Sequence, residues 1–218
     1  MVRASIKNKV KKFMFISTDK VINPSSIMGK TKLEAEKIIL NANKNKKNKY
    51  KTMFSLIRFG NIIGSRGSVL PKFIEQISSN QNLTVTNKKM TRFFTTISLA
   101  VSQIFQSLKI MKGREIFIIH NMSSFKIIDL AKALKRYFKY KKKISIEGIR
   151  EGEKLFEELA TPSEISKSKI INNLLIVSKN NKLKKNNNSL NLDLLNSKKG
   201  KLLEEKSILE FLKKSRLI

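Results

Sequence analysis

The sequence of 218 residues contains no cysteine and no tryptophan, and its only histidine is His120. Without cysteine there is no disulfide and no thiolate metal site, and a single histidine excludes a histidine-based metal cluster. No apolar run is long enough to span a membrane, and the basic N-terminus lacks the continuous apolar stretch of a signal peptide. We therefore expect a cytoplasmic protein without a metal site or a transmembrane segment, in which His120 is structural or solvated.

Acidic residues are scarce, because 16 Asp and Glu stand against 46 Lys and Arg, which gives a formal net charge of +30. Such a charge attracts polyanions, including nucleic acids and anionic membrane surfaces. The basic residues, however, lie in asparagine-rich tracts such as 44–49 and 182–188, and they form no arginine stripe interleaved with aromatic side chains. The distribution favours a compositional bias toward Lys, Asn and Ile over a specific nucleic-acid site.

The order of apolar runs and helical patterns along the sequence is typical of a globular α/β protein. A chain of this length can bury a substantial core. Short apolar runs predict strands over 12–18, 52–58, 115–119 and 144–147. Helical periodicity predicts helices over 30–43, 69–79, 101–108 and 127–138. This alternation favours parallel strand pairing. Residues 179–218 turn to Lys, Asn and Ser, which predicts a flexible tail with a terminal helix over 202–212.

One segment combines groups that suit proton transfer. Ser17-Thr18-Asp19-Lys20 follows an apolar run at 13–16, and Lys32 opens a predicted helix. Side chains at the carboxyl end of a strand in an open α/β sheet face the ligand crevice. An adjacent acid and base at that place suit acid–base catalysis on a small substrate. An isolated tetrapeptide of this kind also fits a solvated turn in which Asp19 caps nearby amides.

Five segments in order resemble the extended short-chain dehydrogenase/reductase superfamily, and within it the nucleotide-sugar 4,6-dehydratases of bacterial capsule and flagellin glycosylation. The segments are 17–32, 58–69, 84–86, 90–94 and 148–155. The resemblance covers residues 1–178 and implies part of a Rossmann-type parallel sheet with a small α/β substrate-binding subdomain. It assigns 1–82 and 95–125 to the Rossmann-type domain, and 83–94 and 126–178 to the subdomain.

Two departures from this family stand out. Met28 occupies the usual tyrosine position, as in a branch typified by larger membrane-anchored dehydratases, and a thioether cannot exchange a proton. Met28 also fits plain core packing. The glycine-rich GxGxxG turn, which in the family holds the dinucleotide pyrophosphate at a helix N-terminus, is absent from this sequence. The first residues look like the helix before the catalytic strand, so we expect a C-terminal fragment that lacks the N-terminal half of the cofactor domain.

The resemblance implies NAD rather than NADP as cofactor, and a UDP-N-acetylhexosamine as the UDP-sugar that becomes a 4-keto-6-deoxy product. Its catalytic positions correspond to Thr18, Asp19, Lys20, Met28 and Lys32. Thr18 would hydrogen-bond the sugar, Asp19 would protonate the departing C6 hydroxyl, and Lys20 would remove the C5 proton. Lys32 would also bind the nicotinamide ribose.

The same resemblance implies that the backbone at Phe59 and Gly60 passes the nicotinamide. The implied substrate-binding residues are Asn61, Ser68, Val69, Thr84, Arg92, Arg150 and Glu153. The two arginines would clamp a diphosphate, a role that guanidinium geometry suits, although Glu151 adds a negative charge where the family more often has proline. Glu153 also fits a helix cap.

Other functions stay open at this point. They are an epimerase of the same superfamily, a non-catalytic fragment that binds a nucleotide-sugar, and a nucleic-acid-binding module, which the charge distribution disfavours. The Asp19-Lys20 pair favours a dehydratase over an epimerase, because epimerisation at C4 needs no acid–base pair for elimination. Expected partners are a UDP-sugar and either a second copy of the chain or a separate N-terminal half.

Overall fold

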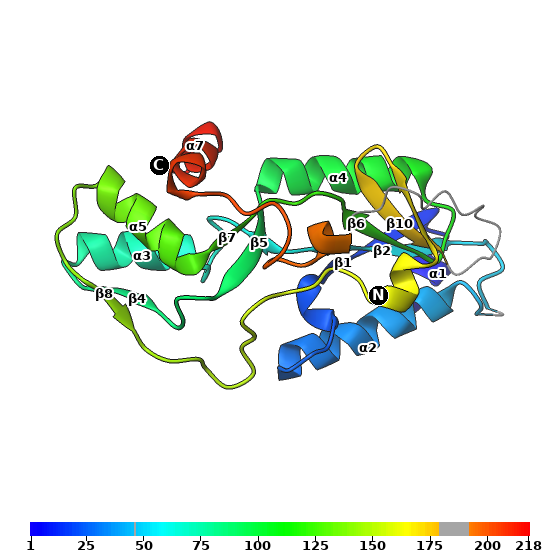
Figure 1. Cartoon of the computed structure of the whole chain (residues 1–218). Coiled ribbons are helices and arrows are strands. Elements are labelled where there is room, and N and C mark those ends of the chain that lie inside the picture. Colours follow the sequence, from blue (N-terminus) through cyan, green and yellow to red (C-terminus); the bar gives the residue numbers. More distant parts are fainter. Residues whose placement is uncertain (46, 179–191) are drawn as a thin grey trace. The chain divides into compact units, whose positions relative to one another are not determined.

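In the computed structural model, which describes residues 1–45, 47–178 and 192–218, three of the four predicted strands lie in one five-stranded sheet (Figure 1). The fourth predicted strand, at 144–147, lies outside this sheet. The strand order is β1 (Lys12–Thr18), β2 (Met53–Phe59), β6 (Glu115–Ile119), β10 (Leu174–Ser178) and β9 (Ser168–Ile171). β1, β2 and β6 pair in parallel, as predicted. β10 pairs antiparallel with both β6 and β9, so β9 and β10, which were not predicted, depart from the expected parallel pairing.

The helices around this sheet are α1 (Val2–Lys7), α2 (Ile27–Ala42), α4 (Ile97–Ile110) and α6 (Pro162–Ile165). A short 3-10 helix, η1 (Asp19–Val21), follows β1 directly. α2 and α4 lie on opposite faces of the sheet (Figure 1). α2 begins three residues before the predicted start, because the Ser26 hydroxyl accepts the Gly29 backbone N–H at 3.2 Å and caps the helix there.

A second set of elements builds two small sheets. One contains β3 (Asn61–Ile62), β5 (Thr91–Thr95) and β7 (Ser124–Lys126), and the other pairs β4 (Leu83–Val85) with β8 (Ile144–Ile146). The accompanying helices are α3 (Val69–Ser78), α5 (Ile127–Tyr137) and α7 (Glu205–Lys214), with the 3-10 helix η2 (Leu192–Leu195). The apolar faces of α3, α5 and α7 share one core, in which the Phe94 and Phe125 rings stack 3.9 Å apart.

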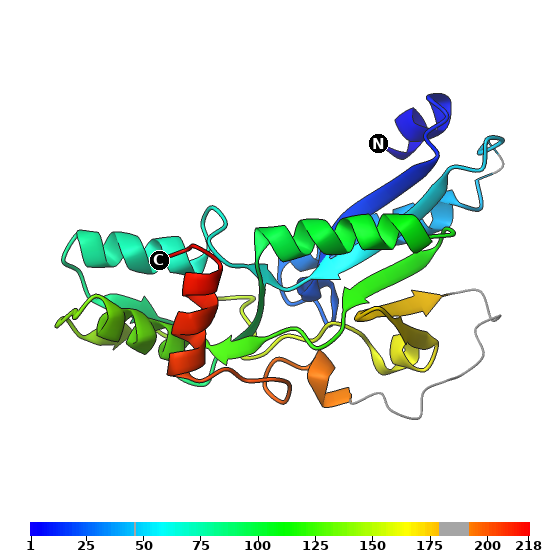
Figure 2. The same ribbon diagram turned by 90° about the horizontal axis from the view of Figure 1, so that it is seen from above.

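The chain thus divides into two units, one with the five-stranded sheet and one with α3, α5 and α7 (Figure 2). The borders of these units differ from those of the predicted domains. The first contains residues 1–59, 98–120 and 158–178, and the second contains 60–97, 121–157 and 192–218. Residues 60–82 join the second unit because β3 pairs with β5 and α3 packs in the second core. Residues 158–178 join the first because β10 pairs with β6.

The predicted tail falls into two parts. Residues 179–191 lie outside the described residues. Residues 192–218 belong to the second unit and contain the predicted terminal helix, observed as α7. None of the described helices combines the length and apolar character needed to cross a membrane.

Candidate functional site

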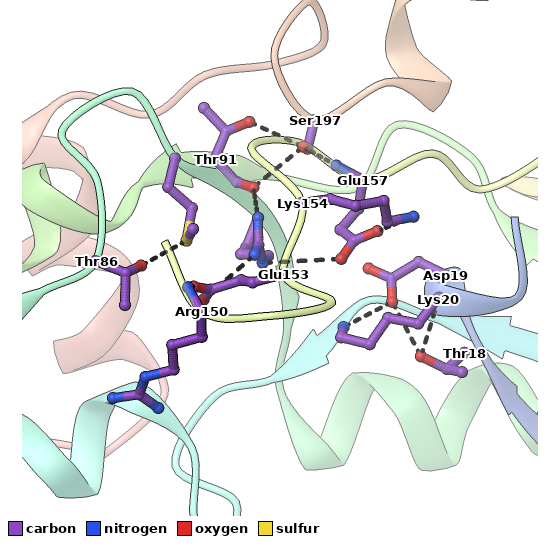
Figure 3. Close-up of polar contacts among 12 residues, drawn as sticks. Thr18, Asp19, Lys20, Thr86, Thr91, Arg150, Glu153, Lys154, Glu157 and Ser197 are labelled. Atoms are coloured by element: carbon purple, nitrogen blue, oxygen red, sulfur yellow. Dashed lines mark hydrogen bonds and ion pairs between the residues drawn. The ribbon is translucent and has the colours of Figure 1, made fainter. Parts of the chain in front are cut away.

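The predicted catalytic segment lies at the carboxyl end of β1 (Figure 3). The Thr18 hydroxyl donates to Asp19 Oδ1 at 2.9 Å and accepts the backbone N–H of Lys20 at 3.4 Å. The Lys20 ammonium pairs with the same Asp19 oxygen at 2.9 Å. Because Asp19 is fully buried and its oxygen accepts from side chains, the solvated-turn interpretation of this segment is wrong.

The other carboxylate oxygen of Asp19, Oδ2, is buried and has no hydrogen-bond partner among the described residues. A buried polar oxygen without a partner costs free energy, and such atoms are rare in folded proteins. Both contacts of this carboxylate therefore involve one oxygen and leave the second available. This arrangement suits a carboxyl group that exchanges a proton with a ligand hydroxyl.

The first turns of α2 bring two more predicted residues toward this strand end. The Lys32 ammonium donates to the Ile16 carbonyl at 3.2 Å and lies 4.7 Å from the centre of the Phe15 ring. Met28, one helical turn earlier, is 47% exposed, so its interpretation as a core residue is wrong. Lys32 and Met28 therefore lie one turn apart on α2, so their side chains share one helix face.

Gly29 is a residue of this region that the sequence analysis missed. A Cβ atom at this position would lie 2.4 Å from the Lys20 carbonyl oxygen and 3.2 Å from Pro24 Cβ. Glycine inside a helix destabilises it relative to alanine, so its position within α2 was the available signal of a close approach. Gly29 allows α2 to pack directly against the backbone of the predicted catalytic segment.

β2 ends next to β1, and its last residue, Phe59, pairs with Thr18 in parallel register. Phe59 is buried. Gly60, the first residue of the second unit, packs so closely on β5 that a Cβ atom there would lie 2.5 Å from Phe93 Cβ. Packing thus requires a glycine at position 60, and the contact of these two residues with a nicotinamide stays a prediction.

A pocket of about 230 Å³ in the second unit gathers all seven predicted substrate-binding residues. They are Asn61, Ser68, Val69, Thr84, Arg92, Arg150 and Glu153. Lys72 also lines the pocket, and the sequence analysis missed it because one lysine carries no signal in a chain with 46 basic residues. The charged lining therefore comprises three cations, Lys72, Arg92 and Arg150, and one carboxylate, Glu153.

Helix α3 begins at this pocket. Ser68 is its N-cap residue, but the Ser68 hydroxyl makes no capping bond. That hydroxyl oxygen is buried and has no hydrogen-bond partner in the described part of the chain. The first backbone N–H groups of a helix lack intrahelical acceptors, and the helix dipole attracts anions there. The start of α3 and the Ser68 hydroxyl can thus donate to an anionic ligand.

Arg92 lies in β5 with its guanidinium nearly buried. Its Nη1 donates to the Thr91 carbonyl at 2.8 Å. Its Nη2 lies 3.7 Å from a Glu153 carboxylate oxygen, and its Nε lies 3.9 Å from Glu157. Since charged N–H···O bonds are typically about 2.7–2.9 Å long, these two carboxylates approach Arg92 without saturating its donors. Arg92 retains capacity for a further acceptor.

Arg150 is mostly exposed, with its guanidinium 3.4 Å from Glu147. Its backbone N–H donates at 3.3 Å to Glu153 Oε2, and Glu153 Oε1 faces Arg92. Glu153 thus links the two predicted arginines. Its interpretation as a helix cap is wrong, because the next helix, α6, begins at Pro162 with a different cap.

Arg58 lies in a buried ion cluster of the first unit, together with Glu36 and Glu164. It donates to Glu36 at 2.9 and 2.7 Å, to Glu164 at 2.9 and 2.8 Å, and to the Leu159 carbonyl at 3.3 Å. Burial opposes the charge of Arg58, but its hydrogen bonds to both carboxylates offset this and raise its pKa. Burial would raise the pKa of Glu164, but the Arg58 hydrogen bond and charge hold it below its ordinary value. The cluster joins β2, α2 and α6.

His120 follows β6 and matches none of these groups. Burial lowers the pKa of its imidazole, and its Nε2 has no hydrogen-bond partner among the residues described. Its backbone N–H donates to the Asn173 carbonyl at 2.9 Å, where β10 begins. The structure thus places His120 at a strand connection of the first unit.

A comparison with protein families matches residues 1–179 to a family described as polysaccharide biosynthesis protein. The capsular polysaccharide biosynthesis protein CapD of Staphylococcus aureus is 45% identical over 162 residues, which are 73% of this chain and 26% of that protein. The inverting UDP-N-acetylglucosamine 4,6-dehydratase of Campylobacter jejuni is 36% identical over 203 residues, which are 93% of this chain and 59% of that protein. The UDP-glucose 4-epimerase of Rickettsia bellii is 38% identical over 174 residues, 79% of this chain and 50% of that protein.

Among solved structures, Pen from Bacillus thuringiensis has a TM-score of 0.89 at 32% identity and covers 100% of this chain and 66% of that chain. A dTDP-glucose 4,6-dehydratase from Bacillus anthracis, solved with NAD, has a TM-score of 0.61 at 16% identity, which shows the fold alone. The chain therefore spans between 26% and 66% of the length of these three curated relatives and of Pen. Its homologues are nucleotide-sugar dehydratases and epimerases, and the chain belongs to the polysaccharide biosynthesis protein family.

Proposed function

We propose that the chain carries the catalytic segment and the substrate pocket of an NAD-dependent UDP-sugar 4,6-dehydratase whose substrate is a UDP-N-acetylhexosamine. The observation that carries the proposal is the buried Asp19 carboxylate, which contacts Lys20 through one oxygen and leaves the other without a partner among the described residues. Elimination of water needs an acid for the leaving hydroxyl and a base for the adjacent proton. Asp19 and Lys20 supply both groups side by side.

The contact between these two residues accounts for their division of roles. A proton that passes from the Lys20 ammonium to Asp19 across their 2.9 Å contact leaves a carboxylic acid and a neutral amine. The amine then takes the C5 proton of the sugar, and the acid protonates the C6 hydroxyl as it leaves. The Thr18 hydroxyl, which holds Asp19 Oδ1 at 2.9 Å, keeps the acid oriented.

The pocket of the second unit fits a nucleoside diphosphate. Three cations line it, and the start of α3 adds backbone N–H groups and the Ser68 hydroxyl. Phosphate oxygens accept from guanidinium groups and from helix N-termini. The charge pattern therefore supports a doubly charged diphosphate group at this place.

NAD, when bound, supplies the chemistry of hydride removal from the sugar and hydride return. The Lys32 ammonium, at the Ile16 carbonyl near the carboxyl end of β1, fits a contact with the nicotinamide ribose. The pyrophosphate-binding GxGxxG turn has no counterpart in this sequence. We expect the chain alone to bind NAD weakly or not at all, which titration calorimetry checks. A dissociation constant for NAD below about 1 μM would contradict this expectation.

The test of the proposed reaction is an assay with the chain fused to the glycine-rich half of a relative. Lys20→Ala and Asp19→Asn should each lower the dehydration rate by about 10²- to 10⁴-fold, the range for a positioned acid or base. Met28→Leu is the control and should have little effect, since methionine offers no proton. Loss of turnover in Met28→Leu with full activity in Lys20→Ala would overturn the assignment.

An epimerase is the second candidate, because the Rickettsia bellii relative bears that name. The same fusion distinguishes the two reactions by product analysis. A 4-keto-6-deoxy sugar nucleotide supports the dehydratase, whereas a C4 epimer that keeps its C6 hydroxyl supports the epimerase. The Asp19→Asn variant should spare epimerisation, because that reaction expels no hydroxyl group.

A further inference from the structure

In the segment that follows η2, the buried hydroxyl of Ser197 contacts Thr91, the first residue of β5 (Figure 3). Ser197 is fully buried, although serine is usually exposed. Its Oγ lies 2.9 Å from Thr91 Oγ1 and donates at 3.3 Å to the Thr91 carbonyl. The same Oγ accepts the Glu157 backbone N–H at 2.9 Å, and the Ser197 backbone N–H donates to the Glu157 carbonyl at 2.9 Å. Ser197 thus joins Thr91 to Glu157.

Thr91 and Glu157 both contact Arg92. The Thr91 carbonyl accepts Arg92 Nη1 at 2.8 Å, and the Glu157 carboxylate lies 3.9 Å from Arg92 Nε. Glu157 is buried and also pairs with the Lys154 ammonium at 2.6 Å. Arg92 lines the pocket, whereas Ser197 does not. A change at Ser197 would therefore reach the pocket indirectly, through Thr91 and Glu157, which contact Arg92.

This contact forms only when the C-terminal segment folds onto β5, because Ser197 is 106 residues from Thr91 in the sequence. The family match ends at residue 179, so Ser197 lies outside the part of the chain that it covers. A second contact holds the same segment independently. Both the Ser124 backbone N–H and the Ser124 hydroxyl donate to the Lys201 carbonyl, at 2.9 and 3.2 Å.

We propose that Ser197 is a positioning residue for Arg92, and that the C-terminal segment 192–201 thereby completes the diphosphate-binding pocket of the second unit. The nature of the ligand rests on the proposed function. Ser197 fixes the backbone of Glu157 and the carbonyl of Thr91. The Thr91 carbonyl and the carboxylate of Glu157 in turn set the direction of the Arg92 guanidinium. Without the Ser197 hydroxyl, the guanidinium loses its fixed orientation, and a diphosphate loses one preorganised partner.

The test compares Ser197→Ala with Ser124→Ala in the full chain. Each variant removes one buried serine hydroxyl that contacts the C-terminal segment, but the Ser124 hydroxyl bonds Lys201. The first readout is the NMR signal of the Arg92 Nε–Hε group in the ligand-free protein, assigned with Arg92→Lys. Ser197→Ala should shift this signal and speed its exchange with water, whereas Ser124→Ala should leave it unchanged.

The second readout is the affinity for UDP, measured by titration calorimetry. Ser197→Ala should weaken UDP binding about 3- to 10-fold, the effect of one net hydrogen bond, and Ser124→Ala less than about twofold. Thr91→Val removes the other hydroxyl of the pair and gives the same test if Ser197→Ala does not fold. An unchanged Arg92 signal in Ser197→Ala, or equal changes in both serine variants, would overturn the proposal. If the wild type binds no UDP, the proposed ligand is wrong, while the Arg92 signal still decides whether Ser197 positions this arginine.

Discussion

Each unit contains an arginine whose side chain is at most 7% exposed, and the two differ in how many of their N–H donors have acceptors. In the first unit, all five N–H groups of Arg58 have acceptors, with four contacts of 2.7–2.9 Å to Glu36 and Glu164. In the second unit, the carboxylates nearest to Arg92 lie at 3.7 and 3.9 Å. A saturated arginine holds the fold together, whereas an unsaturated arginine in a pocket retains capacity for a ligand.

The surroundings of the two arginines explain this difference. Arg58 lies between α2 and α6, where Glu36 and Glu164 are also held in place by their own elements. Arg92 lines a pocket, and its neighbour Glu153 is shared with the backbone of Arg150. Burial makes a charge costly unless it is paired, so the incomplete pairing of Arg92 is consistent with an anionic ligand.

The largest expected effect is the loss of Arg58. Arg58→Met leaves the Glu36 and Glu164 carboxylates without their cation, and removal of one partner from a buried ion cluster costs about 3–5 kcal/mol. Urea unfolding followed by circular dichroism measures this change in the free energy of unfolding. Arg150→Met is the matched control in the second unit and should change stability by less than about 0.5 kcal/mol, because Arg150 is exposed. Equal losses in both variants would refute the comparison.

The sequence could predict the pocket more fully than the ion cluster. The pocket residues lie in short motifs at family spacing, and all seven line one pocket. The partners of Arg58 lie 22 and 106 residues away in the chain, and no local pattern relates them to it. Ser197 was missed for the same reason, since its contact with Thr91 joins residues that are 106 positions apart in the chain.

The strands show a similar division. β1, β2 and β6 were predicted because each is an apolar run with turns at its ends. The β9–β10 hairpin was missed, although Asn172 and Asn173 both have positive φ, 48° and 63°, and link the two strands. Two asparagines between short apolar runs are a hairpin signal. The β9–β10 pairing could therefore have been predicted from the sequence, whereas the β10–β6 pairing, which assigns residues 158–178 to the first unit, has no such local signal.

Acid should lower the free energy of unfolding by less than Arg58→Met does, because it protonates one carboxylate of the cluster and leaves the arginine in place. The Glu164 pKa lies below its ordinary value of 4.5, since its hydrogen bond to Arg58 and the arginine charge outweigh burial. As the pH falls below about 4.5, the unfolded chain binds a proton at this carboxyl before the folded chain does. The free energy of unfolding therefore decreases until the folded pKa is passed.

Urea midpoints measured from neutral pH to about pH 3 test this dependence. Glu164→Gln should remove part of the decrease, whereas Glu210→Gln, a change at an exposed carboxylate of α7, should retain it. The same decrease in the wild type and in Glu164→Gln would show that the Arg58 contact does not control this titration.

The smallest effect is expected on the pocket side of the comparison, for substitutions of Arg150. Arg150→Met removes one pocket cation, and a charge-assisted hydrogen bond is worth about 1.5 kcal/mol or more, so UDP affinity should fall at least about tenfold. Arg150→Lys keeps the charge at this exposed position and should weaken UDP binding only about two- to threefold, since only the fork geometry is lost. Titration calorimetry of both variants measures the two changes. Arg58→Lys, by contrast, should destabilise the protein even though it keeps the charge. The buried cluster uses every donor of the guanidinium, and an ammonium cannot replace them.

If Arg150→Lys weakened UDP binding as much as Arg150→Met, Arg150 would act through a saturated fork like that of Arg58. The distinction between the two arginine environments would then fail.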